Sequence, residues 1–286
     1  MLLDAFDRAV TVYFFHPLRH LWVRDERVRI PILMYHSISD DPEERNHPYY
    51  WTTTSPKIFA RHMQFLAESG YSVLALEDAV RRIESNTPSR NREVAITFDD
   101  GFRDFYTDAF PILARYGFTA SVFLPTDYIG DDSLSFNGKK CLDWSQVQEL
   151  QRAGISFGSH TMSHPQLQLL DSKAQSREVR LSREILEERL GRPINSFAYP
   201  YAFPECDGSF TRQFREILQD AGYKHGVSTV LGLASATDDR FFLRRLPASS
   251  RDDSDFLQAK LQGGYDWLHS AQYVAKLMKD SMRKGS

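Results

Sequence analysis

The chain has 286 residues, of which 42% are hydrophobic, so it is long enough to bury a sizeable core as one barrel-like domain instead of two. Its net charge of −3 argues against nucleic acid as a partner. The two cysteines, Cys141 and Cys206, have neither metal-site nor redox spacing and do not indicate a disulfide framework, although a single bridge between them stays open.

The N-terminal stretch favours an amphipathic helix. One helical face would carry Leu2, Leu3, Phe6, Val10, Tyr13 and Phe14, with Arg19, His20 and Arg24 after it. The apolar run from Val10 to Phe15 is far shorter than the about 20 residues that span a bilayer, and no small-residue cleavage site follows it. We therefore expect a cytoplasmic protein without a signal peptide. The helix is expected to cap the barrel floor, with a peripheral membrane contact as the alternative.

An apolar strand then delivers His36 to its C-terminal end, within Pro-Ile-Leu-Met-Tyr-His-Ser at 31–37. The loop from Ser39 to Thr54 is long for a βα connection. It carries side chains suited to stacking on sugar rings or, equally, to a packed lid: His47, Tyr49, Tyr50 and Trp51.

The remaining chain alternates helix and strand patterns, which predicts a parallel sheet. A helix begins at Ser55 and Pro56, as N-cap and N1, and ends at Gly70. The expected helices that follow are Phe105 to Tyr116, Trp144 to Ala153, Ser172 to Leu190 and Phe210 to Ala221. The expected strands are Tyr71 to Leu76, Glu93 to Phe98, Thr119 to Leu124, Ile155 to Ser159, Tyr223 to Ser228 and Phe241 to Leu246. The turn-rich stretch from Asp127 to Lys140 is typical of an active-site loop.

Two of these strands end in residues that can bind a metal. Thr-Phe-Asp-Asp-Gly occupies 97–101, and Ser-His-Thr-Met-Ser-His-Pro occupies 159–165. Asp-Asp-Gly alone is an ordinary turn and His-x-x-x-His alone arises by chance, but both motifs lie at strand ends where α/β folds collect catalytic groups. We predict a divalent metal held by Asp100, His160 and His164, with Asp99 as the base that activates water.

These motifs resemble those of the NodB-like polysaccharide deacetylases of carbohydrate esterase family 4, over about Pro31 to Ala248. The resemblance implies a distorted (β/α)7 barrel and hydrolysis of N-acetyl groups from amino sugars. It also implies the same roles for Asp99, Asp100 and the two histidines. The corresponding domains are an N-terminal helical extension at 1–28, a deacetylase domain at 29–250, and C-terminal helices at 251–286 that pack on the barrel.

The family's third motif, Arg-x-Pro-Tyr-Gly, is altered here to Ala-Tyr-Pro-Tyr-Ala at 198–202. By resemblance, the Tyr201 amide would donate to the oxyanion, and Tyr199 and Pro200 would complete this substrate-binding segment. The motif arginine is replaced by Ala198. Arg245, or its neighbour Arg244, is a candidate to supply the missing charge to Asp99, although a solvated arginine at a strand end is the simpler expectation.

Trp144 and His36 are two further candidates for the site. Asp143 is predicted to be an N-cap, with Trp144 packing or lining the cleft. Met-Tyr-His-Ser at 34–37 resembles the poly-β-1,6-N-acetylglucosamine deacetylase subgroup, in which the general acid comes from the first strand. The resemblance implies that His36 is the acid, although a lone His at a strand end is commonly structural.

The sequence thus predicts a metal-dependent carbohydrate N-deacetylase that acts on an N-acetylated glycan such as an exopolysaccharide. Zn²⁺ is the expected ion, with Co²⁺, Ni²⁺ or Mn²⁺ as alternatives. Two other functions stay open, namely deacylation of a lipid-linked or nucleotide-linked sugar or other small amide, and glycan binding without turnover. The pattern does not predict an oligomeric state.

Overall fold

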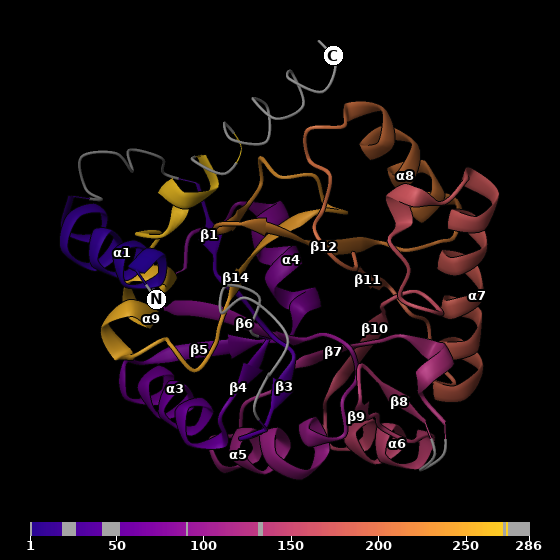
Figure 1. Cartoon of the computed structure of the whole chain (residues 1–286), viewed down its shortest axis with the longest axis horizontal. Helices are drawn as coiled ribbons and strands as arrows, with labels where there is room; N and C mark the ends of the chain where they lie inside the picture. Colours follow the sequence, from indigo (N-terminus) through magenta and orange to yellow (C-terminus); the bar gives the residue numbers. More distant parts are fainter. Residues whose placement is uncertain are drawn as a thin grey trace.

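The computed structural model describes residues 2–18, 27–41, 52–89, 91–130, 134–270 and 273. Seven parallel strands pair in a ring whose order follows the chain, and the ring closes where the last strand pairs with the first (Figure 1). They are β2 (Ile32–Tyr35), β6 (Arg92–Phe98), β7 (Ser121–Leu124), β10 (Ser156–Ser159), β11 (Ser196–Ala198), β12 (His225–Leu231) and β14 (Leu243–Pro247). Strand β5 (Tyr71–Leu74) pairs with β6 as an eighth parallel strand. The predicted (β/α)7 barrel is confirmed.

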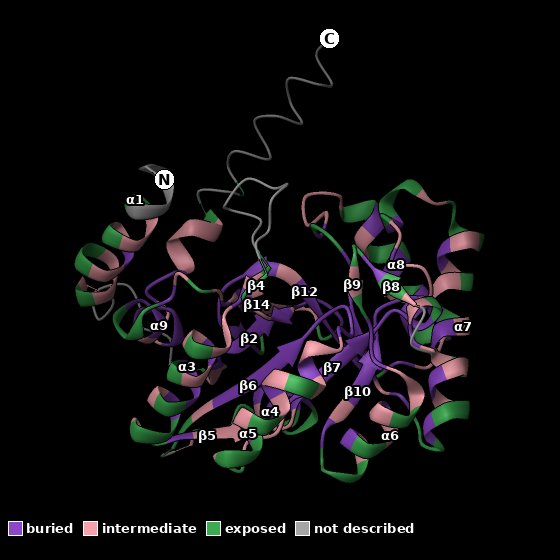
Figure 2. Ribbon diagram, turned by 60° about the horizontal axis from the view of Figure 1, so that its bottom comes forward, coloured by how far each residue is buried: buried purple, intermediate pink, exposed green. Residues whose placement is uncertain are grey.

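Helices surround the ring or, in one case, close its end, and they expose the side that faces away from the barrel (Figure 2). They are α3 (Pro56–Glu68), α4 (Leu76–Ser85), α5 (Phe110–Arg115), α6 (Trp144–Arg152), α7 (Ser172–Leu190), α8 (Gly208–Asp220) and α9 (Ser254–Leu261). The predicted N-caps Ser55 and Asp143 accept hydrogen bonds from the first turns of α3 and α6. The predicted helix Phe105 to Tyr116 begins instead as a π-helix, η3 (Phe105–Ala109), and continues as α5. Helix α4 was not predicted.

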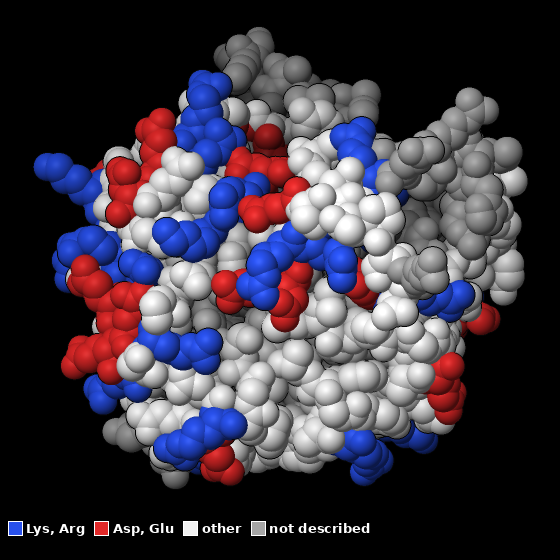
Figure 3. Space-filling view, turned by 180° about the vertical axis from the view of Figure 1, so that it is seen from behind, with Lys and Arg blue, Asp and Glu red and all other residues white. Residues whose placement is uncertain are grey.

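Apolar side chains form two clusters, one between the barrel and its helices and a smaller one inside the ring. The inner cluster joins strand residues such as Ile32, Ala95 and Phe123 to Leu76 and Ile83 of α4. Helix α4 therefore closes the end of the barrel at which the strands begin, and the opposite end remains for the site. Charges of both signs alternate on the face opposite that of Figure 1, in keeping with the small net charge (Figure 3).

Short strand pairs build the edges of the barrel. At the carboxyl end, β3 (Ser37–Ile38) pairs with β4 (Thr53–Thr54), and β8 (Ser135–Phe136) forms a hairpin with β9 (Lys139–Lys140). The expected active-site loop at 127–140 is therefore partly a hairpin, preceded by the 3-10 turn η4 (Thr126–Tyr128). At the opposite end, β1 (Arg29–Ile30) pairs with β13 (Ala234–Ser235). The disulfide between Cys141 and Cys206 that the sequence left open does not form.

The N-terminal helix continues from α1 (Leu2–Val10) into the π-helix η1 (Thr11–Phe15), and it lies against α9 and the turns after it. The expectation that its apolar face caps the barrel floor is wrong, because Phe6, Tyr13 and Phe14 are exposed and α4 occupies the floor. Within the described ranges, no helix combines the length and apolarity needed to cross a bilayer.

Candidate active site

The two acidic side chains of the site follow β6 directly. Asp99 and Asp100 are both almost fully buried. Asp100 adopts the left-handed conformation, with φ 72°, and Gly101 follows it with φ 61°. A Cβ at position 101 would lie 2.7 Å from the Leu124 side chain, so the turn that aims Asp100 inward requires glycine there.

The two histidines lie in the loop after β10, where the chain turns sharply. Thr161 and His164 both have positive φ, and the Thr161 hydroxyl accepts from the His164 N–H at 3.0 Å. Glu178 of α7 holds this loop from outside, since its carboxylate accepts from the N–H groups of Met162 and Ser163 at 2.9 and 3.0 Å. Glu178 was not identified from the sequence, because it lies 14 residues beyond His164 and its role depends on the packing of α7.

Three potential ligand atoms converge at this end of the barrel. His160 Nε2 and His164 Nε2 lie 3.5 and 3.3 Å from Asp100 Oδ1 and 3.2 Å from each other. The Nδ1 atom of His160 donates to the Ala198 carbonyl at 2.8 Å, which leaves its Nε2 lone pair directed at the cluster. Asp100 Oδ1 is buried without a hydrogen-bond partner among the described residues. Acceptor atoms packed in this way fit a bound divalent cation, and the donor set of two imidazoles and one carboxylate is typical of zinc.

The protonation of the cluster follows from burial and from neighbouring charges. Burial acts to raise the pKa of Asp100, but its contact with His160 and the charges of nearby imidazoles outweigh burial and lower that pKa. Burial also acts to lower the pKa of His160, but Asp100 and the charge of Asp99 outweigh it and raise that pKa. Burial and the charge of His160 lower the pKa of His164 to about 4. Near neutral pH, His164 is therefore a neutral ring that can bind a metal.

Asp99 is held by Arg245 from inside the barrel. Nη1 and Nη2 of Arg245 each donate to one carboxylate oxygen of Asp99 at 2.7 Å, and Nε donates to the Ser228 carbonyl at 2.9 Å. Burial acts to raise the pKa of Asp99, but the charge of Arg245 outweighs it and the pKa lies well below its usual value. The expectation of a solvated arginine is wrong, since Arg245 has no exposed surface. Arg244 points elsewhere and pairs with Asp238 at 3.0 Å.

His36 lies at the end of β2, beside the acidic motif. The Asp99 N–H donates to the carbonyl of Tyr35, the residue before His36, at 3.0 Å. The half-buried His36 ring acts electrostatically on both aspartates and on His164, so it is within interaction range of the ligand cluster. The next residue, Ser37, is fixed by hydrogen bonds to Asp104 at 2.5 Å and from Lys139 at 2.6 Å. These contacts limit where the His36 backbone can move.

Aromatic rings line the site around His164. The Tyr201 ring lies 4.6 Å from the His164 ring between centroids, and Phe136 of the β8–β9 hairpin lies 4.8 Å from it. Tyr201 is 49% exposed and also has a positive φ. Phe136 was missed in the sequence, because nothing in the hairpin pattern shows which ring turns inward.

Two of the other predicted residues pack against side chains outside the ligand cluster. Tyr199 is buried among Phe203, Phe210 and Phe214, where it packs as core and cannot touch a substrate. Trp144 packs under the guanidinium of Arg189 on α7, at 5.4 Å. Pro200 is buried beside Tyr201. The predicted sugar-stacking residues His47, Tyr49, Tyr50 and Trp51 fall outside the described residues.

Backbone strain concentrates at this site. Asp100, Thr161, His164 and Tyr201 are four of the six described non-glycine residues with positive φ. Each such residue costs about 1–3 kcal/mol and persists only where its surroundings enforce it. The fold therefore maintains these four conformations at a cost to stability, as is common where side chains must meet at one point.

Comparison with known proteins places this arrangement in a family. Residues 86–226 match the polysaccharide deacetylase model. YxkH of Bacillus subtilis, a protein assigned to the polysaccharide deacetylases, is 31% identical over 229 residues, which cover 80% of this chain and 75% of that protein. A Staphylococcus epidermidis poly-β-1,6-N-acetyl-D-glucosamine N-deacetylase is 30% identical over 52% of this chain, and the alignment spans 54% of that enzyme. The Escherichia coli enzyme of the same name is 24% identical, with 38% of its length covered.

Solved structures agree with the barrel. The Streptococcus pyogenes deacetylase PplD, in complex with acetate, superposes with a TM-score of 0.71 at 28% identity, over 82% of this chain and 99% of PplD. IcaB from Ammonifex degensii shares the fold, with a TM-score of 0.64 at 21% identity over 82% of this chain and 97% of IcaB. This chain belongs to the polysaccharide deacetylase family.

Proposed function

We propose that this protein removes N-acetyl groups from the amino-sugar residues of a glycan in a metal-dependent hydrolysis. The observation that carries the proposal is the convergence of Asp100, His160 and His164 beside a second carboxylate, Asp99, that takes no part in the ligand set. A site that only bound a cation would not need a separate buried carboxylate held ionised next to it.

Asp100, His160 and His164 would hold the ion. A divalent metal bound there supplies Lewis-acid chemistry, because it polarises a carbonyl and makes a nearby water acidic enough to react near neutral pH. The chain's own contribution is the direction of the ligands. The Ala198 carbonyl fixes the tautomer of His160, and Glu178 fixes the loop that carries His164.

Asp99 is proposed as the general base. Its low pKa keeps it ionised, and Arg245 uses one lone pair of each carboxylate oxygen. Since a carboxylate has about four acceptor sites, lone pairs remain to take a proton from water. A base with a strongly lowered pKa is a weak proton acceptor, so proton transfer to Asp99 depends on the water being made acidic.

His36 and Tyr201 are proposed to complete the reaction. His36, on the first strand, would donate a proton to the departing amine nitrogen, since without that proton the amine is a poor leaving group. The Tyr201 N–H would donate to the oxyanion that forms on the acetamide carbonyl. The positions of the two residues support these roles. The His36 ring interacts electrostatically with Asp99, and the Tyr201 ring lies against the His164 ring.

The substrate is proposed to be a β-1,6-linked N-acetylglucosamine polymer. Two of the named relatives act on poly-β-1,6-N-acetyl-D-glucosamine according to their names, although this chain spans only about half or less of their length. The half-exposed Tyr201 provides an aromatic surface next to the ligand cluster, where the face of a sugar ring can stack.

The test is acetate release from β-1,6-linked N-acetylglucosamine oligomers, compared with chitooligosaccharides, by protein of known metal content. Asp99→Asn should lower the rate by about 10²–10⁴-fold while the metal is retained. Asp255→Asn, at an exposed aspartate of α9, is the matched control and should be unchanged. Tight binding of the oligomers without acetate release by the metal-loaded protein would show a glycan-binding protein instead.

A further inference from the structure

The N-terminal helix turns three large aromatic side chains toward solvent, although Val12 packs against the core. Burial is described for residues 6–18 of this segment, and the exposed ones among them are all uncharged. They are Phe6, Ala9, Tyr13, Phe14 and Pro17. The exposed fraction is 60% for Phe6, 73% for Tyr13 and 53% for Phe14. At 100° per residue these positions fall within one side of a helix, so they form a continuous stripe, here called the aromatic stripe.

Several described polar side chains of the same helix bind partners in the rest of the protein. The Arg8 guanidinium donates to Asp253 at 2.9 Å, and Asp7 accepts from the Tyr265 hydroxyl at 3.1 Å. Further along, Thr11 accepts from the Trp267 indole N–H at 2.9 Å, and His16 contacts Gln262 at 2.9 Å. The stacked rings of Phe15 and Trp267, 5.2 Å apart, add an apolar contact on this inner side.

A helix on the surface of a soluble protein normally buries its apolar face and exposes its polar face. Here the orientation is reversed, and the inward hydrogen bonds and the Arg8–Asp253 ion pair fix it. Leaving three large aromatic side chains in water is unfavourable, so the reversed orientation indicates that something covers the aromatic stripe. Figure 2 shows α1 at the outer edge of the molecule, beyond α9, with nothing described over it.

We propose that the aromatic stripe docks on the surface of a lipid bilayer that contains anionic lipids. Its composition of Phe and Tyr without charge is that of helices that lie in the membrane interface. The area also argues for lipid over a second copy of the chain. The exposed parts of the three rings amount to roughly 400 Å², about half of the roughly 800 Å² per partner in a standard protein interface.

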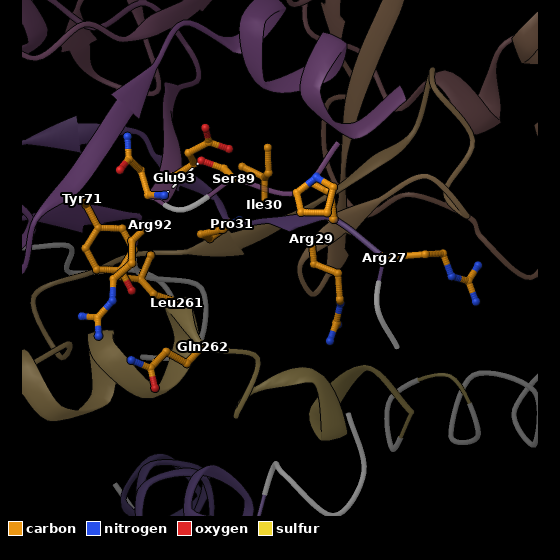
Figure 4. Close-up of a pocket in the computed structure, with 13 residues that line it drawn as sticks. Arg27, Arg29, Ile30, Pro31, Tyr71, Ser89, Arg92, Glu93, Leu261 and Gln262 are labelled. Atoms are coloured by element: carbon orange, nitrogen blue, oxygen red, sulfur yellow. Dashed lines mark hydrogen bonds between the residues drawn. The ribbon is translucent and has the colours of Figure 1, made fainter. Parts of the chain in front are cut away.

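Positive charge lies close to the end of the stripe. A cavity of about 520 Å³ opens at the floor of the barrel beside Gln262, the residue that His16 contacts (Figure 4). Three arginines line it, together with Glu93, which pairs with Arg82. Arg29 pairs with Asp266, whereas Arg92 lies over the Tyr71 ring and pairs with no carboxylate of a described residue. Arg27 is the third. Such groups favour the negatively charged headgroups of an anionic membrane.

The proposal is independent of the deacetylase activity, because none of these groups belongs to the catalytic site.

The experiment is co-sedimentation of the full chain with phospholipid vesicles, made either of phosphatidylcholine alone or with about one third phosphatidylglycerol. The wild type should bind the anionic vesicles. The triple variant F6S/Y13S/F14S should bind at least about tenfold more weakly. Leu169→Ser, which removes an apolar side chain that is 77% exposed elsewhere, should bind as the wild type does.

A second pair of variants avoids any loss of packing. Ala9→Asp places a charge within the aromatic stripe, and Ala67→Asp places the same charge at an exposed alanine of α3. Only Ala9→Asp should weaken vesicle binding. Failure of the wild type to bind either vesicle, or equal binding by all variants, would overturn the proposal. A wild-type dimer that the triple variant converts to a monomer, without vesicle binding, would show instead that the stripe joins two copies.

Discussion

Replacing Arg245 by Met would test how the barrel interior controls the proposed base. Arg245 is fully buried and donates two 2.7 Å hydrogen bonds to Asp99, so its loss leaves a buried carboxylate without its charged partner. Breaking a buried ion pair from one side costs about 3–5 kcal/mol. We expect the free energy of unfolding, measured by urea denaturation at neutral pH, to fall by about that amount.

The pH dependence of the same variant has a definite sign. In the wild type the pKa of Asp99 is lower in the folded state than in the unfolded state. The ionised Asp99 therefore stabilises the fold at every pH above its unfolded pKa, and this stabilisation is lost as the pH falls through its folded pKa. Without Arg245, burial dominates and raises that pKa. The stability deficit should therefore narrow as the pH falls from neutral to mildly acidic values, and the acid limb of the acetate-release profile should move to higher pH.

Arg244→Met is the matched control, because Arg244 is the adjacent residue and makes an ion pair that is partly exposed to solvent. Its loss should cost about 1 kcal/mol or less and leave the acid limb of the pH profile unchanged. The reasoning fails if Arg245→Met is no less stable than Arg244→Met, or if both variants show the same pH profile as the wild type.

Three further predictions concern single side chains. His36→Ala should retain its metal, measured by elemental analysis, and lose about 10²–10⁴-fold in kcat, and unchanged turnover would remove His36 from the mechanism. Glu178→Ala should weaken metal affinity in competition with a chelator by about 10–100-fold, because the loop that carries His164 loses its anchor, and an unaltered affinity would contradict this. Lys260→Met should lower the free energy of unfolding by about 3–5 kcal/mol, because it leaves the buried Asp252 unpaired. Adding Asp252→Asn should recover part of that loss, and its failure to do so would show that packing, not charge, causes the defect.

Local pattern was sufficient to predict the elements that carry the site. The helix over Ser172–Leu190 and its end at Gly191 follow from a polar N-cap and a glycine that adopts positive φ, which are interactions between near neighbours. The motifs around Asp99 and His160 could be placed at strand ends because a buried strand followed by a turn is also a local signal. Their meeting could be expected, since carboxyl ends of parallel strands share one end of a barrel.

Arg245 shows where local pattern is insufficient. Two adjacent arginines near the end of a strand look alike in the sequence, but alternate side chains of a strand point to opposite faces. Position 245 shares the inward direction of Leu243, so its guanidinium enters the barrel and meets Asp99, which lies 146 residues earlier. Pairing at that separation depends on the closure of the ring, which the sequence does not display.

The residue types at the site and the places of most helices and strands along the chain were determined by the sequence itself, because hydrophobic pattern, turn residues and metal-ligand chemistry act over short distances. Only the tertiary structure decided which groups surround those residues. Contacts between distant segments decided three features. Glu178 anchors the loop that carries His164, Tyr199 lies in the core, and the helix that carries Phe6, Tyr13 and Phe14 turns them outward. Such contacts form when whole elements pack together, and no window of neighbouring residues contains them.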